Sequence, residues 1–278
     1  MRIRESAVLF PLSVLFLTGF AAAQSPGPAN LDIIGIKLGT PMSDAMQALK
    51  ADNPKMKVTS RTFQSAVFSK PFTLEVDGQD LPATTNDEVT HATETVQLVF
   101  TTPPSEPGVW AMNRRIDFAT SQRPALQTTV DALRKKYGPE TIPPRDPNFA
   151  QTLTWVFDPQ GKLITTGGAQ MSVACQNVLG MFLAGMGAGA QAENIAIATA
   201  GNVQWPQACT SIIVLEADLQ LEQVAPGQNA VKTLTVTLED GGRYMRALAA
   251  TKAAVAAAAK AQQDKQTNQM NQVGAPKL

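Results

Sequence analysis

The chain has 278 residues, of which 44% are hydrophobic and 17% charged, and its 23 basic and 23 acidic side chains leave no net charge. A chain of this length and composition can bury one large core or two smaller ones. Because a neutral chain has no field that concentrates polyanions, binding to nucleic acid or to an anionic membrane surface is disfavoured.

Residues 1–23 have the three parts of a secretory signal peptide. Two arginines precede an apolar run from Ala7 to Phe20, and an A-x-A cleavage site ends at Ala23. The run is shorter than the roughly 17–25 apolar residues of a spanning helix, and Pro11 interrupts it. We therefore expect a periplasmic or secreted protein whose mature chain begins near Gln24 without a transmembrane anchor. An uncleaved anchor is the alternative.

The chain contains two cysteines, Cys175 and Cys209, with 33 residues between them. In an oxidising compartment two cysteines more often pair than stay free, so we expect a disulfide. In the chain-entropy model, closing a loop of this size stabilises the fold by roughly 3–4 kcal/mol. A catalytic or metal-binding thiol is the alternative. Because no cysteine stands at the cleavage site, a lipoprotein anchor is not expected.

Residues 24–118 are expected to form a first unit of one helix followed by strands. Thr40 is suited to the N-cap of a helix, Pro41 to its first position, and Asn53-Pro54 to its end. Between them, an apolar face is formed by Met42, Ala45, Met46 and Leu49. Strands are predicted at 57–63, 72–76, 93–102 and 109–118, with a turn at Asp77-Gly78.

Residues 119–242 are expected to repeat this pattern as a second unit. Arg123-Pro124 opens a helix that Gly138 ends, and its apolar face carries Leu126, Val130, Leu133 and Tyr137. We expect Leu126, Val130 and Leu133 to share one core with Trp155. Strands are predicted at 153–157, 162–165 after a turn at 158–161, 213–222 and 234–238, and a Gly/Ala-rich insertion at 167–210.

Residues 243–278 are expected to form a C-terminal Ala-rich helix to about Gln263, with a polar tail from Lys265 that frays. Together these patterns predict an α+β fold. Antiparallel sheets carry packed helices in two related helix–strand units, followed by the C-terminal helix.

The first helix and its lead-in carry a family resemblance. The stretch from Ile36 to Met46, IKLGTPMSDAM, with Leu49 after it, resembles the "I-x-L-G-M" segment and "x-E-V-x-x-x-L" helix of small outer-membrane lipoproteins of the BamE type. Asp44-Ala45 stands where those proteins have Glu-Val, and the lipidated cysteine is missing. The resemblance implies a helix before an antiparallel sheet in an envelope protein, and no catalytic residue.

Two motifs that suggest catalysis or cofactor binding have simpler explanations. His91, the single histidine, lies in a polar segment where an exposed loop histidine is expected, and a Ser-His-Asp or Cys-His site would need it. Residues 185–190 read G-x-G-x-x-A, but the βαβ context and downstream acidic residue of a dinucleotide site are missing. Met181 and Met186 form no dense methionine motif, and no zinc-ligand spacing occurs. We therefore expect neither a cofactor nor a metal.

Alternate residues of the clearest predicted strand carry polar side chains, at Glu216, Asp218, Gln220 and Glu222. Such a row is typical of the solvated face of a half-buried sheet. Carboxylate pairs also serve glycosidases, and carboxylate oxygens bind calcium. The sequence therefore predicts an exported, non-enzymatic binding or interaction module of the bacterial envelope, with an unidentified protein or small-ligand partner. The alternative is a periplasmic hydrolase that uses Glu216 and Asp218.

Overall fold

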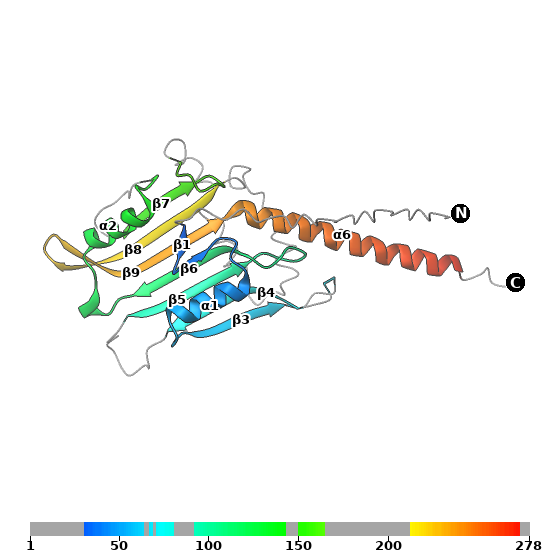
Figure 1. Cartoon of the computed structure of the whole chain (residues 1–278), viewed down its shortest axis with the longest axis horizontal. Coiled ribbons are helices and arrows are strands. Elements are labelled where there is room, and N and C mark those ends of the chain that lie inside the picture. The colour runs from blue at the N-terminus through cyan, green and yellow to red at the C-terminus, as the bar shows by residue number, and fades with distance from the viewer. Residues whose placement is uncertain are drawn as a thin grey trace, which may run out of the picture.

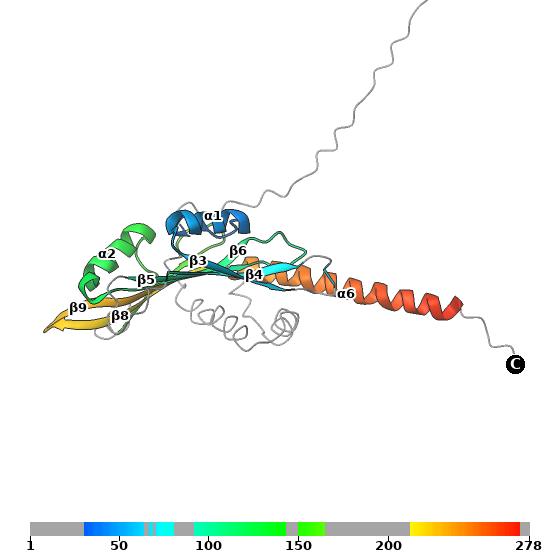
Figure 2. The same cartoon turned by 90° about the horizontal axis from the view of Figure 1, so that it is seen from below.

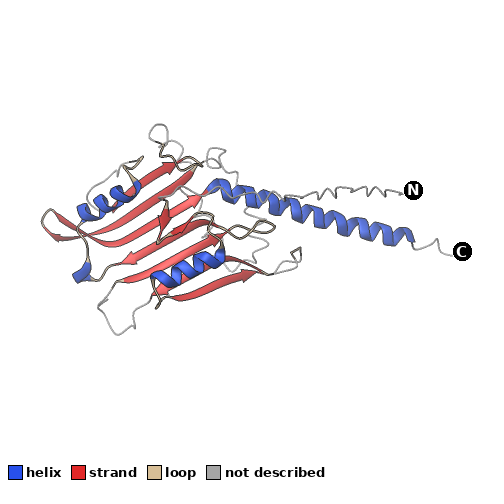
Figure 3. Cartoon of the chain, viewed as in Figure 1, coloured by secondary structure: helices blue, strands red, loops and turns tan. Residues whose placement is uncertain are grey.

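The computed structural model describes residues 31–63, 67–68, 71–80, 92–142, 150–164 and 212–272. These residues form an α+β protein with a seven-stranded antiparallel sheet of order β3-β4-β5-β6-β9-β8-β7 (Figures 1 and 3). Helices α1 and α2 lie on the same face of this sheet, and α6 extends from one end of it (Figure 2). The predicted fold class is confirmed.

The sheet strands are β3 (Lys57–Phe63), β4 (Phe72–Asp80), β5 (Thr93–Phe100), β6 (Val109–Asp117), β7 (Ala150–Phe157), β8 (Ile213–Ala225) and β9 (Gln228–Asp240). A separate two-stranded sheet contains β1 (Asp32–Ile33) and β2 (Ile36–Lys37). The helices are α1 (Met42–Asp52), a 3-10 turn at Thr120–Gln122, α2 (Leu126–Tyr137) and α6 (Gly241–Gln272).

The two helix–strand units meet in the middle of the sheet. In the first, α1 precedes a meander from edge strand β3 to β6, and in the second, α2 precedes β7, β8 and β9. The last strands of the two units, β6 and β9, pair from Ala111↔Glu239 to Asp117↔Thr233. The two segments therefore share one continuous sheet.

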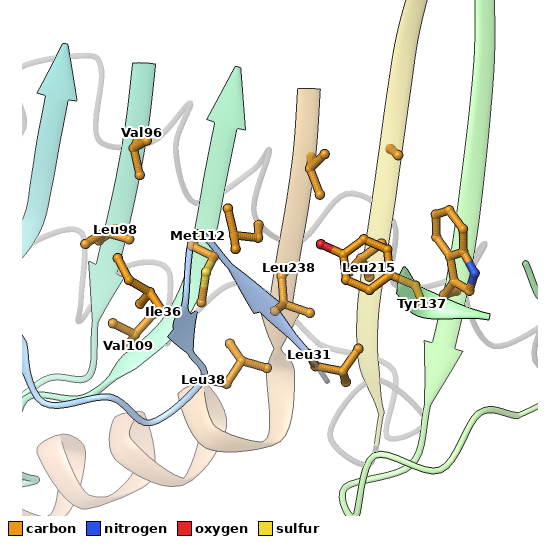
Figure 4. Packing of buried hydrophobic residues seen from close by; sticks show 14 of the residues in the cluster. Leu31, Ile36, Leu38, Val96, Leu98, Val109, Met112, Tyr137, Leu215 and Leu238 are labelled. Atoms are coloured by element: carbon orange, nitrogen blue, oxygen red, sulfur yellow. The ribbon is translucent and has the colours of Figure 1, made fainter. Parts of the chain in front are cut away.

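The main core lies between the helices and the face of the sheet that they cover. Buried side chains from both units line it side by side, including Leu98, Met112, Leu215 and Leu238 (Figure 4). As predicted, Val130, Leu133 and Trp155 are buried in this cluster, and Leu126 packs against it. The indole Nε1 of Trp155 donates a hydrogen bond to the carbonyl of Gly138 (2.8 Å), which ties the end of α2 to the sheet.

Helix α1 begins without the cap that the sequence predicts. Pro41 occupies the N-cap position, and no described side chain caps the helix. The Thr40 hydroxyl instead accepts a hydrogen bond from the main-chain N–H of Lys37 (3.1 Å). The reason is that Thr40 closes the turn after β2, where its main chain also bonds Val109.

The predicted turn at Asp77-Gly78 is wrong, because β4 continues through both residues to Asp80. Gly78 faces the core, where a Cβ atom would overlap the sulfur of Met56 and press on Leu49 of α1. Glycine is therefore needed here for close packing under α1, and not for a change of chain direction.

Other boundaries differ from prediction as well, since β7, β8 and β9 are longer than the predicted strands at 153–157, 213–222 and 234–238. The predicted return strand at 162–165 appears, as far as Ile164, as an isolated bridge between Leu163 and Phe157 and a hydrogen bond from the N–H of Ile164 to the carbonyl of Val156 (2.8 Å). The predicted frayed tail from Lys265 is helical as far as Gln272. Lysine, glutamine and methionine favour helix, so the helix continues past the alanine-rich stretch.

Helix α6 is anchored at its beginning and projects at its end. Tyr244 stacks on Trp110 with ring centroids 4.5 Å apart, and Thr251 hydrogen-bonds the hydroxyl of Thr102 (2.7 Å). From Ala259 onward its side chains are exposed, and this part extends beyond the sheet (Figures 1 and 2). Among the described helices, none is both long and apolar enough to cross a membrane.

Candidate functional site

The face of the sheet that points away from α1 and α2 carries continuous rows of polar residues, here called the polar face. Successive side chains of a strand point to opposite faces, so residues paired in register share one. One row crosses all seven strands as Thr59, Asp77, Gln97, Asn113, Thr237, Glu216 and Thr154. The next row is Lys57, Gln79, Thr95, Arg115, Thr235, Asp218 and Thr152.

At the β3–β5 end of the polar face, two carboxyl groups lie together. Glu75 is only 2% exposed; Arg61 Nη1 lies 3.2 Å from its Oε2, and the Gln97 side-chain amide donates a hydrogen bond to Oε1. Burial, and then the charge of Asp77, raise the pKa of Glu75. Burial also raises the pKa of Asp77, against the opposing effect of Arg61. This end therefore holds a proton more readily than solvent-exposed carboxylates do.

The centre of the polar face is tied by hydrogen bonds between β6 and β9. Asn113 Nδ2 donates to the hydroxyl of Thr237 (2.9 Å), and the hydroxyl of Thr233 donates to Asp117 Oδ1 (2.7 Å). Arg115 donates two hydrogen bonds to the carboxylate of Asp117, from Nε and from Nη2, both 2.8 Å long. The hydrogen bonds from Arg115 hold the pKa of Asp117 below its usual value, so this carboxylate stays charged.

On β8, the carboxyl groups of Glu216 and Asp218 lie on the same face, two residues apart. Asp218 Oδ1 accepts a hydrogen bond from the hydroxyl of Thr152 on β7 (2.6 Å). Burial, and then the neighbouring charge of Asp218, raise the pKa of Glu216 to about 7. Near neutral pH the carboxyl group of Glu216 is therefore partly protonated.

The prediction of one fully solvated row on this strand is therefore wrong in part. Gln220 and Glu222 are exposed, but Glu216 and Asp218 are half-buried. The physical reason is that β8 is an interior strand: Thr154 of β7 and Thr237 of β9 flank Glu216 on both sides. Hydrophobic alternation identifies the face of a strand but not its place in the sheet.

The raised pKa of Glu216 bears on the chemistry that this pair could support. The charge of Asp218 contributes to that shift, after burial. A carboxyl group with a pKa near 7 can donate or accept a proton at neutral pH.

Glu75 and Asp77 are not among the predicted site residues, because Asp77-Gly78 has the composition of a turn. The alternation along β4 could have identified them: Leu74 and Val76 are buried in the core, so Glu75 and Asp77 between and after them point to the opposite face of the sheet. Several predicted features lie outside the described residues: the signal peptide, His91, Cys175, Cys209, Met181, Met186 and the 185–190 motif. Within the described ranges, no group of three or more His, Cys, Asp or Glu side chains could hold a metal ion.

Comparison of the chain with known protein families, with curated proteins and with solved structures found no match.

Proposed function

We propose that this chain is an exported protein of the bacterial envelope that acts as a non-enzymatic binding module, with the polar face as its binding surface. Export is supported by the signal-peptide pattern of residues 1–23 and by the resemblance of the Ile36–Leu49 stretch to BamE-type envelope proteins. The partner is an envelope protein or a small polar ligand.

The observation that carries the proposal is the composition of the polar face. All fourteen positions of its two central rows are polar, and all except the buried Thr154 offer hydroxyl, amide, carboxyl or cationic groups in register. Such a surface presents donors and acceptors at strand spacings of about 4.8 Å. A polar partner that lies across the strands therefore meets several hydrogen-bonding groups at once, which favours recognition by many weak contacts.

The binding function is tested by capture from envelope extract with the mature chain as bait. Thr235→Arg places a bulky cation in the middle of the polar face, and Thr128→Arg makes the same change on the exposed side of α2. We expect Thr235→Arg to lose a specifically captured partner that the wild type and Thr128→Arg retain. Equal capture by all three proteins would contradict a role for the polar face.

Export is tested separately. Cell fractionation should place the protein in the periplasm or the medium, and its intact mass should lack residues 1–23. Retention of these residues in the membrane fraction would reject export without bearing on the polar face.

The alternative function, a periplasmic hydrolase, is favoured by one feature, the raised pKa of the half-buried Glu216 beside Asp218. A group with a pKa near 7 is suited to general acid–base catalysis at neutral pH. The test is a panel of ester, peptide and glycoside substrates with the wild type and Glu216→Gln. Turnover that Glu216→Gln abolishes would establish the hydrolase and reject the non-enzymatic proposal.

A further inference from the structure

A pocket of about 410 Å³ lies between the first turn of α2 and the hairpin of β8 and β9. It is lined by Arg123, Leu126, Gln127, Val224, Asn229 and Ala230, among others. Main-chain contacts hold its walls together: Ala125 and Ala230 form a bridge, and the N–H of Val231 donates to the carbonyl of Pro124 (2.9 Å). In Figure 1 this hairpin lies at the end of the sheet remote from the projecting part of α6.

The pocket is separate from the polar face described above. Val224 lies eight residues beyond Glu216 along β8, which corresponds to on the order of 26 Å in a strand. An inference about the pocket therefore does not depend on the proposed binding function.

Arg123 is an unusual lining residue for a surface pocket, because a charged side chain is rarely as buried as this one, which is only 11% exposed. Its Nη1 lies 2.5 Å from Glu222 Oε2, but Glu222 keeps 45% of its side chain in solvent. Within the described part of the chain, the buried Nε of Arg123 has no hydrogen-bond partner. A guanidinium offers five N–H donors, so a single carboxylate contact leaves most of its binding capacity unused.

The rest of the pocket combines a second attraction for anions with apolar walls. Ala125 is the N-cap of α2, and no described side chain caps this end of the helix. The N–H groups of a first helical turn carry partial positive charge. Val224, which is 58% exposed, together with Leu126 and Ala230, supplies apolar surface. Pockets of ~300–1,000 Å³ with apolar walls and few polar groups are typical of small-molecule sites.

We propose that this pocket binds a small organic carboxylate with a short apolar body. The carboxylate accepts hydrogen bonds from the guanidinium of Arg123 beside the uncapped end of α2, and the apolar body packs on Leu126, Val224 and Ala230. Arginine suits this role because its planar fork matches a carboxylate and is weakly hydrated. Glu222 remains on the solvent side of Arg123 as its second partner.

The test uses hexanoate as the probe and follows it by two-dimensional NMR titration of the full mature chain. Hexanol has the same body without the charge, and inorganic phosphate has charge without the body. We expect saturable shifts confined to the pocket residues with hexanoate, and binding at least about tenfold weaker with either of the other two. Equal binding of phosphate and hexanoate would overturn the proposed apolar contribution, and equal binding of hexanol would overturn the role of charge.

Two variants test the placement of the ligand. Arg123→Gln should weaken hexanoate binding about tenfold or more, and it leaves Glu222 in water without burying a lone charge. Val224→Asp adds a repelling charge at the exposed rim without disturbing the core, and Val67→Asp makes the same change at an exposed valine outside the pocket. Loss of binding in Val224→Asp with retention in Val67→Asp supports the site. Unchanged binding in Val224→Asp, or shifts elsewhere in the molecule, would overturn it.

Discussion

At the scale of single residues, the pair of Glu216 and Asp218 is the feature that most changes the interpretation of the sequence. The alternation of polar side chains along β8 is the same as on a solvated strand, yet Glu216 is half-buried beside the charge of Asp218. Burial disfavours the charged carboxylate, and the neighbouring charge adds to this effect. The pair therefore makes the stability of the folded chain depend on pH in the neutral range.

The sign of this dependence follows from the raised pKa. Glu216 titrates near pH 7 when folded and near 4.5 ordinarily, so between these values the folded state binds more protons than the unfolded state. The stabilisation is complete below about pH 4.5 and is lost as pH rises through about 7. Glu216→Gln mimics the protonated group, and we expect it to raise stability at pH 8 by about 1–3 kcal/mol and to change it little at pH 5.

Denaturant unfolding of the wild type and Glu216→Gln at both pH values measures this difference. Gln220→Glu, which alters charge at an exposed position of the same strand, serves as the control and should shift stability by less than about 0.5 kcal/mol. A Glu216→Gln variant that is equally destabilised at pH 5 and pH 8 would mean that Glu216 does not titrate near neutral pH.

At the scale of elements, most helices and strands follow from local pattern. The apolar faces of α1 and α2 recur at three- and four-residue spacing, and Gly138 ends α2 with a positive φ of 87°, where glycine is favoured. The misplaced features depend on neighbours that the sequence does not identify. Gly78 is small because Met56 and Leu49 lie above it, and Thr40 turns away from α1 to bond Lys37.

Helix α2 should lose stability when its buried face is shortened. Leu133 is buried in the same cluster as Trp155, so Leu133→Ala should cost about 2–5 kcal/mol through lost burial and a residual cavity. Gln127→Ala, on the exposed side of the same helix, should cost less than about 0.5 kcal/mol. Denaturant unfolding of both variants distinguishes these outcomes, and a neutral Leu133→Ala would show that α2 is not packed on the sheet.

Helix α6 should divide into an anchored and a dispensable part. Removal of residues 260–278 takes away only exposed helical residues and those beyond Gln272, so the melting temperature should change by no more than about 2 °C. Thr251→Val removes the hydroxyl that bonds Thr102 and the carbonyl of Ala247, and should cost roughly 1–3 kcal/mol. If the truncation unfolded the protein while Thr251→Val did not, the anchor would have to lie in the distal part.

At the scale of the whole molecule, the α+β fold class could be predicted from sequence, but the joining of β6 and β9 in one sheet could not. Strands β6 and β9 pair although they are far apart in the chain. Both alternate apolar and polar residues, as other strands do, so the sequence pattern alone does not identify which strands pair. The polar face depends on the pairing of β6 with β9. This pairing brings Asn113 next to Thr237 and so connects the two ends of the polar face, each of which carries carboxyl groups. The candidate site is therefore a product of topology and could not be assembled from single strands.

The expected disulfide is a prediction at this scale, since Cys175 and Cys209 would close a loop between β7 and β8. Thiol labelling of the denatured, unreduced protein should find no free cysteine, and reduction should lower stability by roughly 3–4 kcal/mol. Cys175→Ser/Cys209→Ser provides the control, because reducing agent should not affect it. Two reactive thiols in the freshly prepared protein would reject the pairing.

The position of β9 has a consequence for the order in which the sheet can be assembled. The hydroxyl of Thr233 bonds Asp117 across 116 residues of chain, so β6 has no neighbour on its inner side until nearly all of the polypeptide has been synthesised. Contacts between such distant segments slow folding, and during this delay β6 is an open edge that can pair with another chain. Copies that end before Gln228 should therefore associate through β6 and accumulate as aggregates, even though every strand of their first unit is present.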